Sequence, residues 1–186
     1  MKTHRFILLL SLLTLTACGV YLFENPQPMD TKELNVIPSE LFGTYLEKED
    51  KDSLIITSNS YRYTGNGSVF ENSREGILES GKVILKKMNG YYIINQKIAH
   101  PLESSSDSLW DVYALQYKRK RLSVYSLMYE EEKTIEFANS VMEILPVKEQ
   151  KIGEDTLYVI NPTKKEYKKL LDSKLYRKVL EFKKIK

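Results

Sequence analysis

The feature that most constrains the fold is an alternation of apolar and polar residues that recurs after Pro38. Successive side chains of a β-strand point to opposite faces, so a period of two indicates strands. Within this region, Asn89-Gly90 lies between residues 82–87 and 91–94, which have the character of strands. An Asn-Gly pair readily adopts the positive φ angles of a type I′ turn. The pair therefore predicts a β-hairpin.

Further strands are expected along the rest of the chain, with short turns between them. They are predicted at residues 54–57, 61–63, 109–117, 122–127, 134–137, 143–147 and 157–160. In the longest of them, Trp110 and Val112 share one face, and Asp111 and Tyr113 share the other. Eight to ten consecutive strands predict a mainly β fold, either an antiparallel meander or an up-and-down barrel, whose closure removes exposed edges.

The C-terminal region has a different pattern. Thr163-Lys164-Lys165-Glu166 follows a proline and has the spacing of a capping box, in which threonine and glutamate satisfy free amide donors at a helix start. A C-terminal helix is expected here and ends near Asp172-Ser173. A second helical turn is predicted at residues 175–180, followed by a short strand at 182–185. Residues 39–186 are therefore expected to form one β-rich domain.

Phe42-Gly43-Thr44-Tyr45, at the start of the predicted meander, resembles the opening of lipocalin-type barrels, which carry Gly-x-Trp at this place. The chain departs from that pattern because Tyr45 replaces the tryptophan and its single tryptophan is Trp110. The resemblance implies a lipocalin-like barrel and, as a possible function, a carrier for a small apolar ligand. Fold alone does not fix function.

The N-terminus has the layout of a secretory signal, with Lys2, His4 and Arg5 before the apolar residues 6–13. Its end, Leu15, Thr16, Ala17 and Cys18, resembles the lipobox of bacterial lipoproteins. The resemblance implies cleavage after Ala17 and attachment of diacylglycerol to Cys18, so residues 1–17 are expected to be a signal peptide. The membrane is then a partner through the diacylglycerol on Cys18.

Two other interpretations of this segment remain open. Residues 6–23 carry no charge and are long enough for an uncleaved membrane helix, although Ser11 and Gly19 dilute their apolar character. Cys18 could also be a chance cysteine in an ordinary signal peptide. Gly19 follows Cys18 where an aspartate would, by analogy with enteric lipoproteins, retain the protein in the inner membrane. The resemblance therefore favours the outer membrane, with the body facing the periplasm or the surface.

Residues 18–38 are expected to form a flexible tether, because they contain Asn25-Pro26-Gln27-Pro28 and no sustained apolar period. The alternative is that residues 20–23 pack onto the domain.

The residue types of common catalytic and metal sites are sparse. Beyond the signal region, His100 is the one histidine, and it lies in a polar segment with several serines. A triad needs its nucleophile on a rigid element beside an oxyanion hole, so a solvent-exposed His100 is the preferred interpretation. No catalytic residue, metal ligand or cofactor is predicted. A hydrolase site made of two carboxylates remains an alternative, because the 25 acidic residues allow many pairs.

Tyrosine is over-represented, with 13 residues against 6 phenylalanines. The possible ligand-facing aromatics are Tyr61, Tyr63, Tyr91, Tyr113 and Tyr125. Phenol rings on a sheet can stack on a ligand while their hydroxyl groups orient it. The simpler alternative is cross-strand packing.

Charge is unevenly distributed, because residues 163–186 hold ten Lys and Arg against three acids, a net charge of +7. This region could contact anionic headgroups or the acidic body, or could be a solvated helix face. Nucleic acid is not expected as a partner. The sequence thus predicts a lipid-anchored envelope lipoprotein, a non-enzymatic binding or assembly module with an envelope protein partner or a small apolar ligand. A carboxylate-dependent hydrolase is the less favoured alternative.

Overall fold

The secondary structure is dominated by strands. The computed structural model describes residues 19–47, 52–65, 75–78, 81–99, 108–127, 134–152, 155–173 and 175–186. Its strands are β1 (Gly19–Phe23), β2 (Gly43–Glu47), β3 (Ser53–Ile56), β4 (Ser60–Tyr63), β5 (Glu75–Ile77), β6 (Val83–Met88), β7 (Tyr91–Ala99), β8 (Ser108–Lys118), β9 (Arg121–Leu127), β10 (Val147–Ile152), β11 (Asp155–Ile160) and β12 (Tyr176–Lys184). The helices are α1 (Thr134–Met142), α2 (Lys164–Asp172) and the short 3₁₀ helix η1 (Ser39–Leu41). The predicted class, mainly β with a C-terminal helix, is confirmed, although the described residues contain twelve strands rather than eight to ten.

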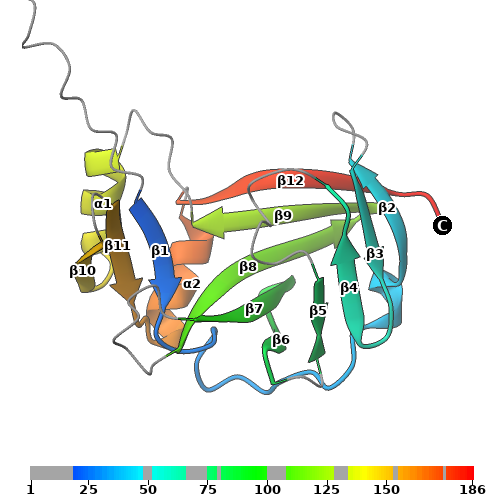
Figure 1. The fold of residues 1–186 in the computed structure, drawn as a ribbon, viewed down its shortest axis with the longest axis horizontal. Helices are drawn as coiled ribbons and strands as arrows, with labels where there is room; N and C mark the ends of the chain where they lie inside the picture. The colour runs from blue at the N-terminus through cyan, green and yellow to red at the C-terminus, as the bar shows by residue number, and fades with distance from the viewer. Residues whose placement is uncertain are drawn as a thin grey trace, which may run out of the picture.

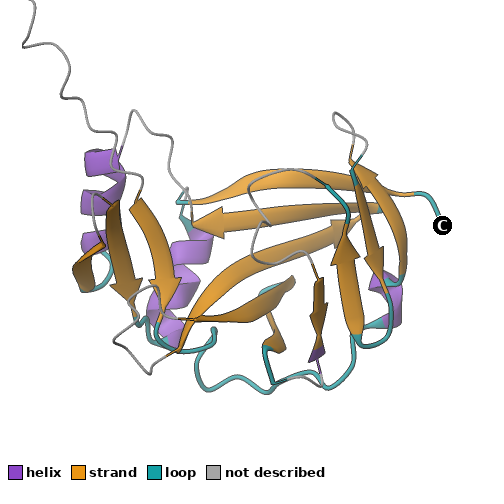
Figure 2. Cartoon of the chain, viewed as in Figure 1, coloured by secondary structure: helices purple, strands orange, loops and turns teal. Residues whose placement is uncertain are grey.

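Nine of the described strands form one curved sheet in the order β6-β7-β8-β9-β12-β2-β3-β4-β5 (Figures 1 and 2). Every neighbouring pair in this order is antiparallel. Strands β2 to β5 and β6 to β9 are two meanders, and β12 lies between them, paired with β9 on one side and β2 on the other. The sheet is not closed, because β5 and β6 are its two ends.

The predicted hairpin is confirmed. Met88 pairs with Tyr91, and the two turn residues between them have left-handed backbones, with φ of 50° at Asn89 and 81° at Gly90. These positive angles are the reason that this pair of residues, rather than bulkier ones, favours the turn.

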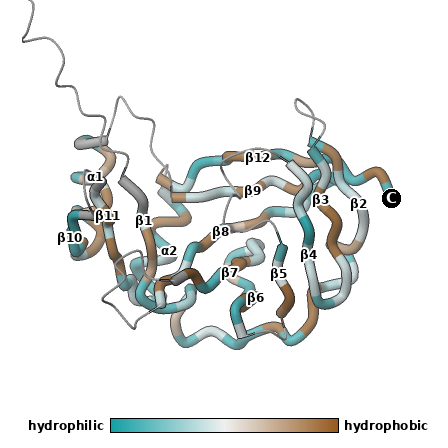
Figure 3. Tube along the Cα trace, viewed as in Figure 1, coloured by the Kyte–Doolittle hydropathy of each residue, from teal (hydrophilic) through white to brown (hydrophobic). Residues whose placement is uncertain are grey.

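The concave face of the curved sheet encloses a hydrophobic core. The tube in Figure 3 changes repeatedly between hydrophilic and hydrophobic along the strands, as expected when one face is buried. The buried residues of this first cluster are Ile37, Leu41, Tyr45, Leu54, Ile56, Tyr61, Tyr63, Val83, Leu85, Tyr92, Tyr113, Leu115, Leu122, Val124 and Phe182. Large side chains fill the interior, leaving an apolar cavity of about 20 Å³, which is room for roughly one water molecule.

A second cluster lies on the convex face of β8. Strands β10, β11 and β1 extend the sheet, with β1 parallel to β11 and joined to β8 where Phe23 pairs with Trp110. Helices α1 and α2 lie beside these strands at one end of the molecule (Figure 1). Trp110 and Val112 pack in this cluster, whereas Tyr113 belongs to the first, so the two predicted faces of the strand are confirmed.

The prediction of a flexible tether at residues 18–38 is wrong. Residues 19–23 form β1, and Leu22 and Phe23 are buried because a short apolar run covers the adjoining strands. The next segment is also fixed: the backbone N–H of Gln27 donates to Asn95 Oδ1 at 2.5 Å, and the buried Lys86 donates to the carbonyl oxygens of residues 26 and 28, each at 3.0 Å. The described part of the chain therefore belongs to the folded domain from residue 19 onwards.

Three predictions in the second half of the chain are also wrong. Residues 134–137 begin α1 instead of forming a strand, because Phe137 and Val141, one helical turn apart, are both buried in the second cluster. Residues 143–146 form a turn, and only Val147 of the predicted strand 143–147 belongs to β10. Residues 176–184 form the single strand β12, with a bulge after Lys178, where a helical turn was expected up to residue 180.

Helix α2 begins as predicted. Thr163 Oγ1 accepts a hydrogen bond from the backbone N–H of Glu166, and the Glu166 carboxylate accepts one from the backbone N–H of Thr163 at 2.8 Å. Tyr167, Leu170 and Leu171 are buried on one face of the helix. The capping box thus fixes where the helix starts, and the apolar face fixes how it packs.

Candidate functional site

An open groove of about 680 Å³ is bounded by described residues. It lies where the curved sheet fails to close, between β4 and β5 on one side and the ends of β6 and β7 on the other. We call it the seam groove. Two apolar side chains at its rim are exposed, Ile55 by 39% and Ile77 by 50%. Exposed aliphatic side chains beside a concave surface are a feature of binding sites.

The inner wall of the seam groove is formed by Tyr61, Val83 and Gln96. The Tyr61 hydroxyl donates to Gln96 Oε1, which links β4 to β7 across the opening. Gly76 on β5 packs tightly on this wall: a Cβ atom there would lie 2.6 Å from Tyr61 Cε1 and 2.7 Å from Val83 Cγ2. Only glycine fits this position without displacing the wall.

A half-buried carboxyl group lies next to this wall. Asp111 on β8 is the cross-strand partner of Gln96, and its Oδ2 accepts a hydrogen bond from the Tyr113 hydroxyl at 2.6 Å. Burial raises the pKa of Asp111 to about 6, although the Tyr113 hydroxyl and the Val112 amide oppose the shift. Burial also raises the pKa of Tyr61, and the charge of Asp111 raises it further. We call Tyr61, Gln96, Asp111 and Tyr113 the polar cluster.

The rim of the seam groove carries charged groups. Arg62 Nε and Glu75 Oε2 form an ion pair of 3.4 Å, and both side chains are largely exposed. Such a pair contributes little to stability. Lys97 and Lys82 are held side by side, because the backbone N–H of Lys97 donates to the Lys82 carbonyl oxygen at 2.7 Å. The rim is therefore more basic than acidic.

The structure separates the five tyrosines predicted to face a ligand. Tyr61, Tyr63 and Tyr113 point into the first cluster, and Tyr63 donates to Asp52 Oδ2 at 2.6 Å. Tyr91 and Tyr125 pack edge to face against each other near the second cluster, with ring centroids 5.7 Å apart. Within the described part of the chain, Tyr61 is the member of this set that lines the seam groove.

Gln96 and Asp111 were not predicted from the sequence, and the structure brings them into the site. The pattern of 109–117 did place Asp111 on the same face as Tyr113, but nothing in the sequence shows that Gln96 is the neighbour of Asp111. His100, Cys18 and the lipobox residues 15–17 lie outside the described residues.

Among the described residues, the groups that lower the pKa of the Asp111 carboxyl against the effect of burial are the Tyr113 hydroxyl and the Val112 amide. Among the described residues, no three His, Cys, Asp or Glu side chains gather closely enough to hold a metal ion. None of the described helices has both the length and the apolar character that a membrane crossing requires.

Comparison with known proteins adds no relative: no family model, curated protein or solved structure matches the chain. The class that fold and site define is a mainly β protein with an open, filled sheet and an external groove.

Proposed function

We propose that the chain is a lipid-anchored bacterial envelope lipoprotein, acylated at Cys18, whose β-rich body is a non-enzymatic binding or assembly module. The anchor rests on the lipobox-like residues 15–18. The binding role rests on one observation, the contrast between the filled interior of the sheet and the open seam groove of about 680 Å³. The outer membrane is the proposed location.

The partner that best suits the groove is an extended segment of another envelope protein. Ile55 and Ile77 offer apolar contact at the rim, and Arg62, Glu75 and Lys97 offer charged groups beside them. Peptide sites combine apolar contacts with a small number of polar groups. A lipocalin-like carrier is the weaker alternative, because a cavity of about 20 Å³ is too small for any lipid-sized ligand.

Acylation is tested by metabolic labelling with an alkyne fatty acid. Wild-type chain and the control Ala17→Gly, which keeps a small residue before the cleavage site, are expected to carry the label and to be processed. Cys18→Ala is expected to carry none and to keep its N-terminal segment, because the thiol is the acceptor. A labelled Cys18→Ala chain would refute the anchor.

Binding at the seam groove is tested by photo-crosslinking in cells. A benzoylphenylalanine in place of Ile77 is expected to give a discrete adduct, and a second change, Ile55→Glu, is expected to reduce that adduct at least fivefold. The matched control places the crosslinker at Met142, which is 41% exposed but belongs to α1, away from the groove. An adduct at both positions, or one insensitive to Ile55→Glu, contradicts a specific groove.

A further inference from the structure

Exposed cations gather where the end of β8, the start of β9 and the end of β12 lie side by side. Lys118 pairs with Arg121 across the turn between β8 and β9, Arg121 pairs with Lys183 of β12, and the backbone N–H of Lys184 donates to the Lys120 carbonyl oxygen at 2.8 Å. We call the exposed cations of this region the basic corner: Lys118, Arg119, Lys120, Lys183 and Lys186. Strand pairing thus builds one basic surface from residues that are more than 60 positions apart.

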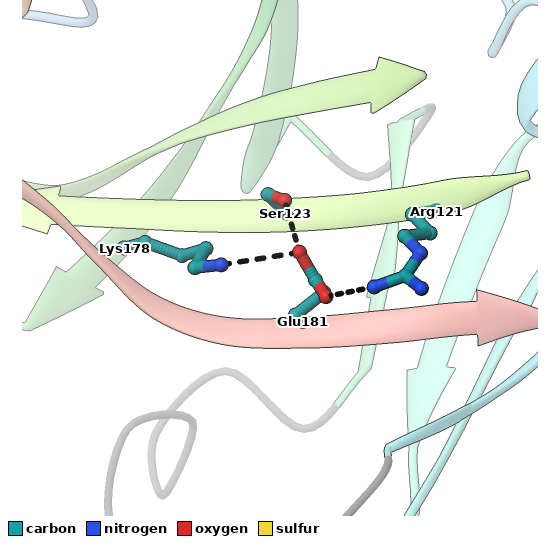
Figure 4. Close-up of polar contacts among 4 residues, drawn as sticks. All are labelled: Arg121, Ser123, Lys178 and Glu181. Atoms are coloured by element: carbon teal, nitrogen blue, oxygen red, sulfur yellow. Dashed lines mark hydrogen bonds and ion pairs between the residues drawn. The ribbon is translucent and has the colours of Figure 1, made fainter. Parts of the chain in front are cut away.

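The positive charge of the basic corner is not neutralised within the described part of the chain. The nearby Glu181 carboxylate is already used: it accepts hydrogen bonds from Arg121 Nη1 at 2.8 Å, Lys178 Nζ at 3.1 Å and Ser123 Oγ at 3.3 Å (Figure 4). These cations lower the pKa of Glu181, so it stays ionised and paired with them. Among the described residues, none of the five corner cations forms an ion pair.

The backbone under the corner adds a second observation. Arg119 and Lys120 form the turn between β8 and β9 with φ of 50° and 62°. Both angles lie in the left-handed region, where Asn and Gly are the preferred residues. Long cationic side chains therefore occupy positions that the backbone disfavours, and an outlier of this kind points to a role for the side chains.

An apolar residue projects among these cations. Ile185, next to Lys186, is 49% exposed. Lys184 beside it lies over two rings, with Nζ 5.8 Å from the Tyr45 centroid and 5.7 Å from the Tyr117 centroid. Lysine and arginine around an exposed aliphatic residue are typical of surfaces that bind anionic bilayers, where the cations meet headgroups and the apolar side chain enters the interface.

We propose that the basic corner docks onto the anionic headgroups of a lipid surface, with Ile185 entering the headgroup layer. β1 and the C-terminal end of β12 lie at opposite ends of the long axis of the molecule (Figure 1). Cys18 directly precedes β1, and one residue spans about 3.8 Å. Where the acylation of the proposed function holds, both ends meet the same membrane and the long axis lies along it.

The test measures the depth of residue 185 in full-length protein reconstituted into vesicles of brominated phosphatidylcholine, with or without 30% phosphatidylglycerol. In the variant Ile185→Trp, the new indole reports on bromine contact, while the native Trp110 is buried and gives a constant background. We expect at least twofold stronger quenching of residue 185 on the anionic vesicles, and we expect 0.5 M salt to abolish the difference by screening. Val36→Trp, at the most exposed of the large apolar residues outside the corner, is expected to show no difference.

Charge-reversal variants complete the test. Arg119→Glu with Lys120→Glu is expected to abolish the anionic-lipid effect on Ile185→Trp. Lys32→Glu with Lys165→Glu makes the same change of net charge at exposed lysines outside the corner and is expected to preserve the effect.

Equal quenching on both kinds of vesicle, or quenching that survives reversal of the corner charges, would overturn the proposal. Binding of the corner to dextran sulfate without quenching on vesicles would also overturn it, in favour of an anionic polysaccharide. Loss of acyl labelling with quenching retained would refute the anchor and leave the lipid-binding corner intact.

Discussion

Asp111 shows how a single side chain couples the core of this protein to pH. Its carboxyl group lies against the Tyr113 hydroxyl on the concave face of the sheet, and burial raises its pKa from 3.8 to about 6. The folded state therefore holds this proton up to a higher pH than the unfolded state does. Because an unfolded chain releases this proton near pH 4, folding binds a proton between about pH 4 and 6.

The free energy of unfolding is therefore expected to fall as pH rises from 4 to 6, by up to about 3 kcal/mol from this group alone. Asp111→Asn removes the ionisable group, so the difference in stability between this variant and wild type should change over the same pH window. Urea unfolding at pH 4.5 and 7.5 measures it.

A companion variant checks the cause of the shift. The Tyr113 hydroxyl lowers the pKa of Asp111, so Tyr113→Phe is expected to raise that pKa further and to extend the pH-dependent loss above pH 6. A wild-type chain whose stability relative to Asp111→Asn is flat from pH 4 to 7 contradicts the assignment.

At the scale of elements, the turn between β8 and β9 places two cationic residues where the backbone conformation favours asparagine and glycine. A non-glycine residue in the left-handed region costs about 1–2 kcal/mol. Replacing Arg119 by Asn and Lys120 by Gly supplies the pair that a type I′ turn prefers. The same pair already occupies the turn between β6 and β7.

The double variant Arg119→Asn, Lys120→Gly is expected to raise the free energy of unfolding by roughly 1–2 kcal/mol, measured by urea unfolding. It removes two corner cations, so it is also expected to weaken quenching of Ile185→Trp on anionic vesicles. A variant that is less stable than wild type shows that the cationic side chains, rather than the backbone, hold the turn.

Elements with a strong local signal were predictable from sequence, and those decided by distant partners were not. Asn89-Gly90 and the capping box at Thr163 act within a few residues, so their patterns suffice. Residues 176–184 contain four cations and two aromatic residues in no clear order. They form a strand because they pair with β9 on one side and with β2 on the other. In the seam groove, Tyr61 was found by its type, whereas Asp111 and Gln96 meet only through cross-strand pairing.

The whole molecule depends on β12, since this strand joins the meander β2–β5 to the meander β6–β9. Its Phe182 is fully buried in the first cluster, beside Leu122. A chain that ends at Ser173 is expected to lose cooperative urea unfolding and its near-ultraviolet circular dichroism, because both meanders then expose edges and apolar faces.

The control for this truncation is a chain that ends at Lys184, the last residue of β12, which is expected to keep a cooperative transition. If the chain ending at Ser173 unfolds with the midpoint of wild type, the sheet is held together without β12.

The position of β12 has a consequence for the timing of folding. β2 and β9 are separated by more than 70 residues of sequence, and the strand that bridges them is made later than either. Contacts of such sequence separation form slowly, since long loops must close first. While synthesis proceeds from the N-terminus at roughly 5–20 residues per second, the two meanders lack the strand that pairs with both of them. The complete sheet of this chain therefore forms only after its last strand has been released.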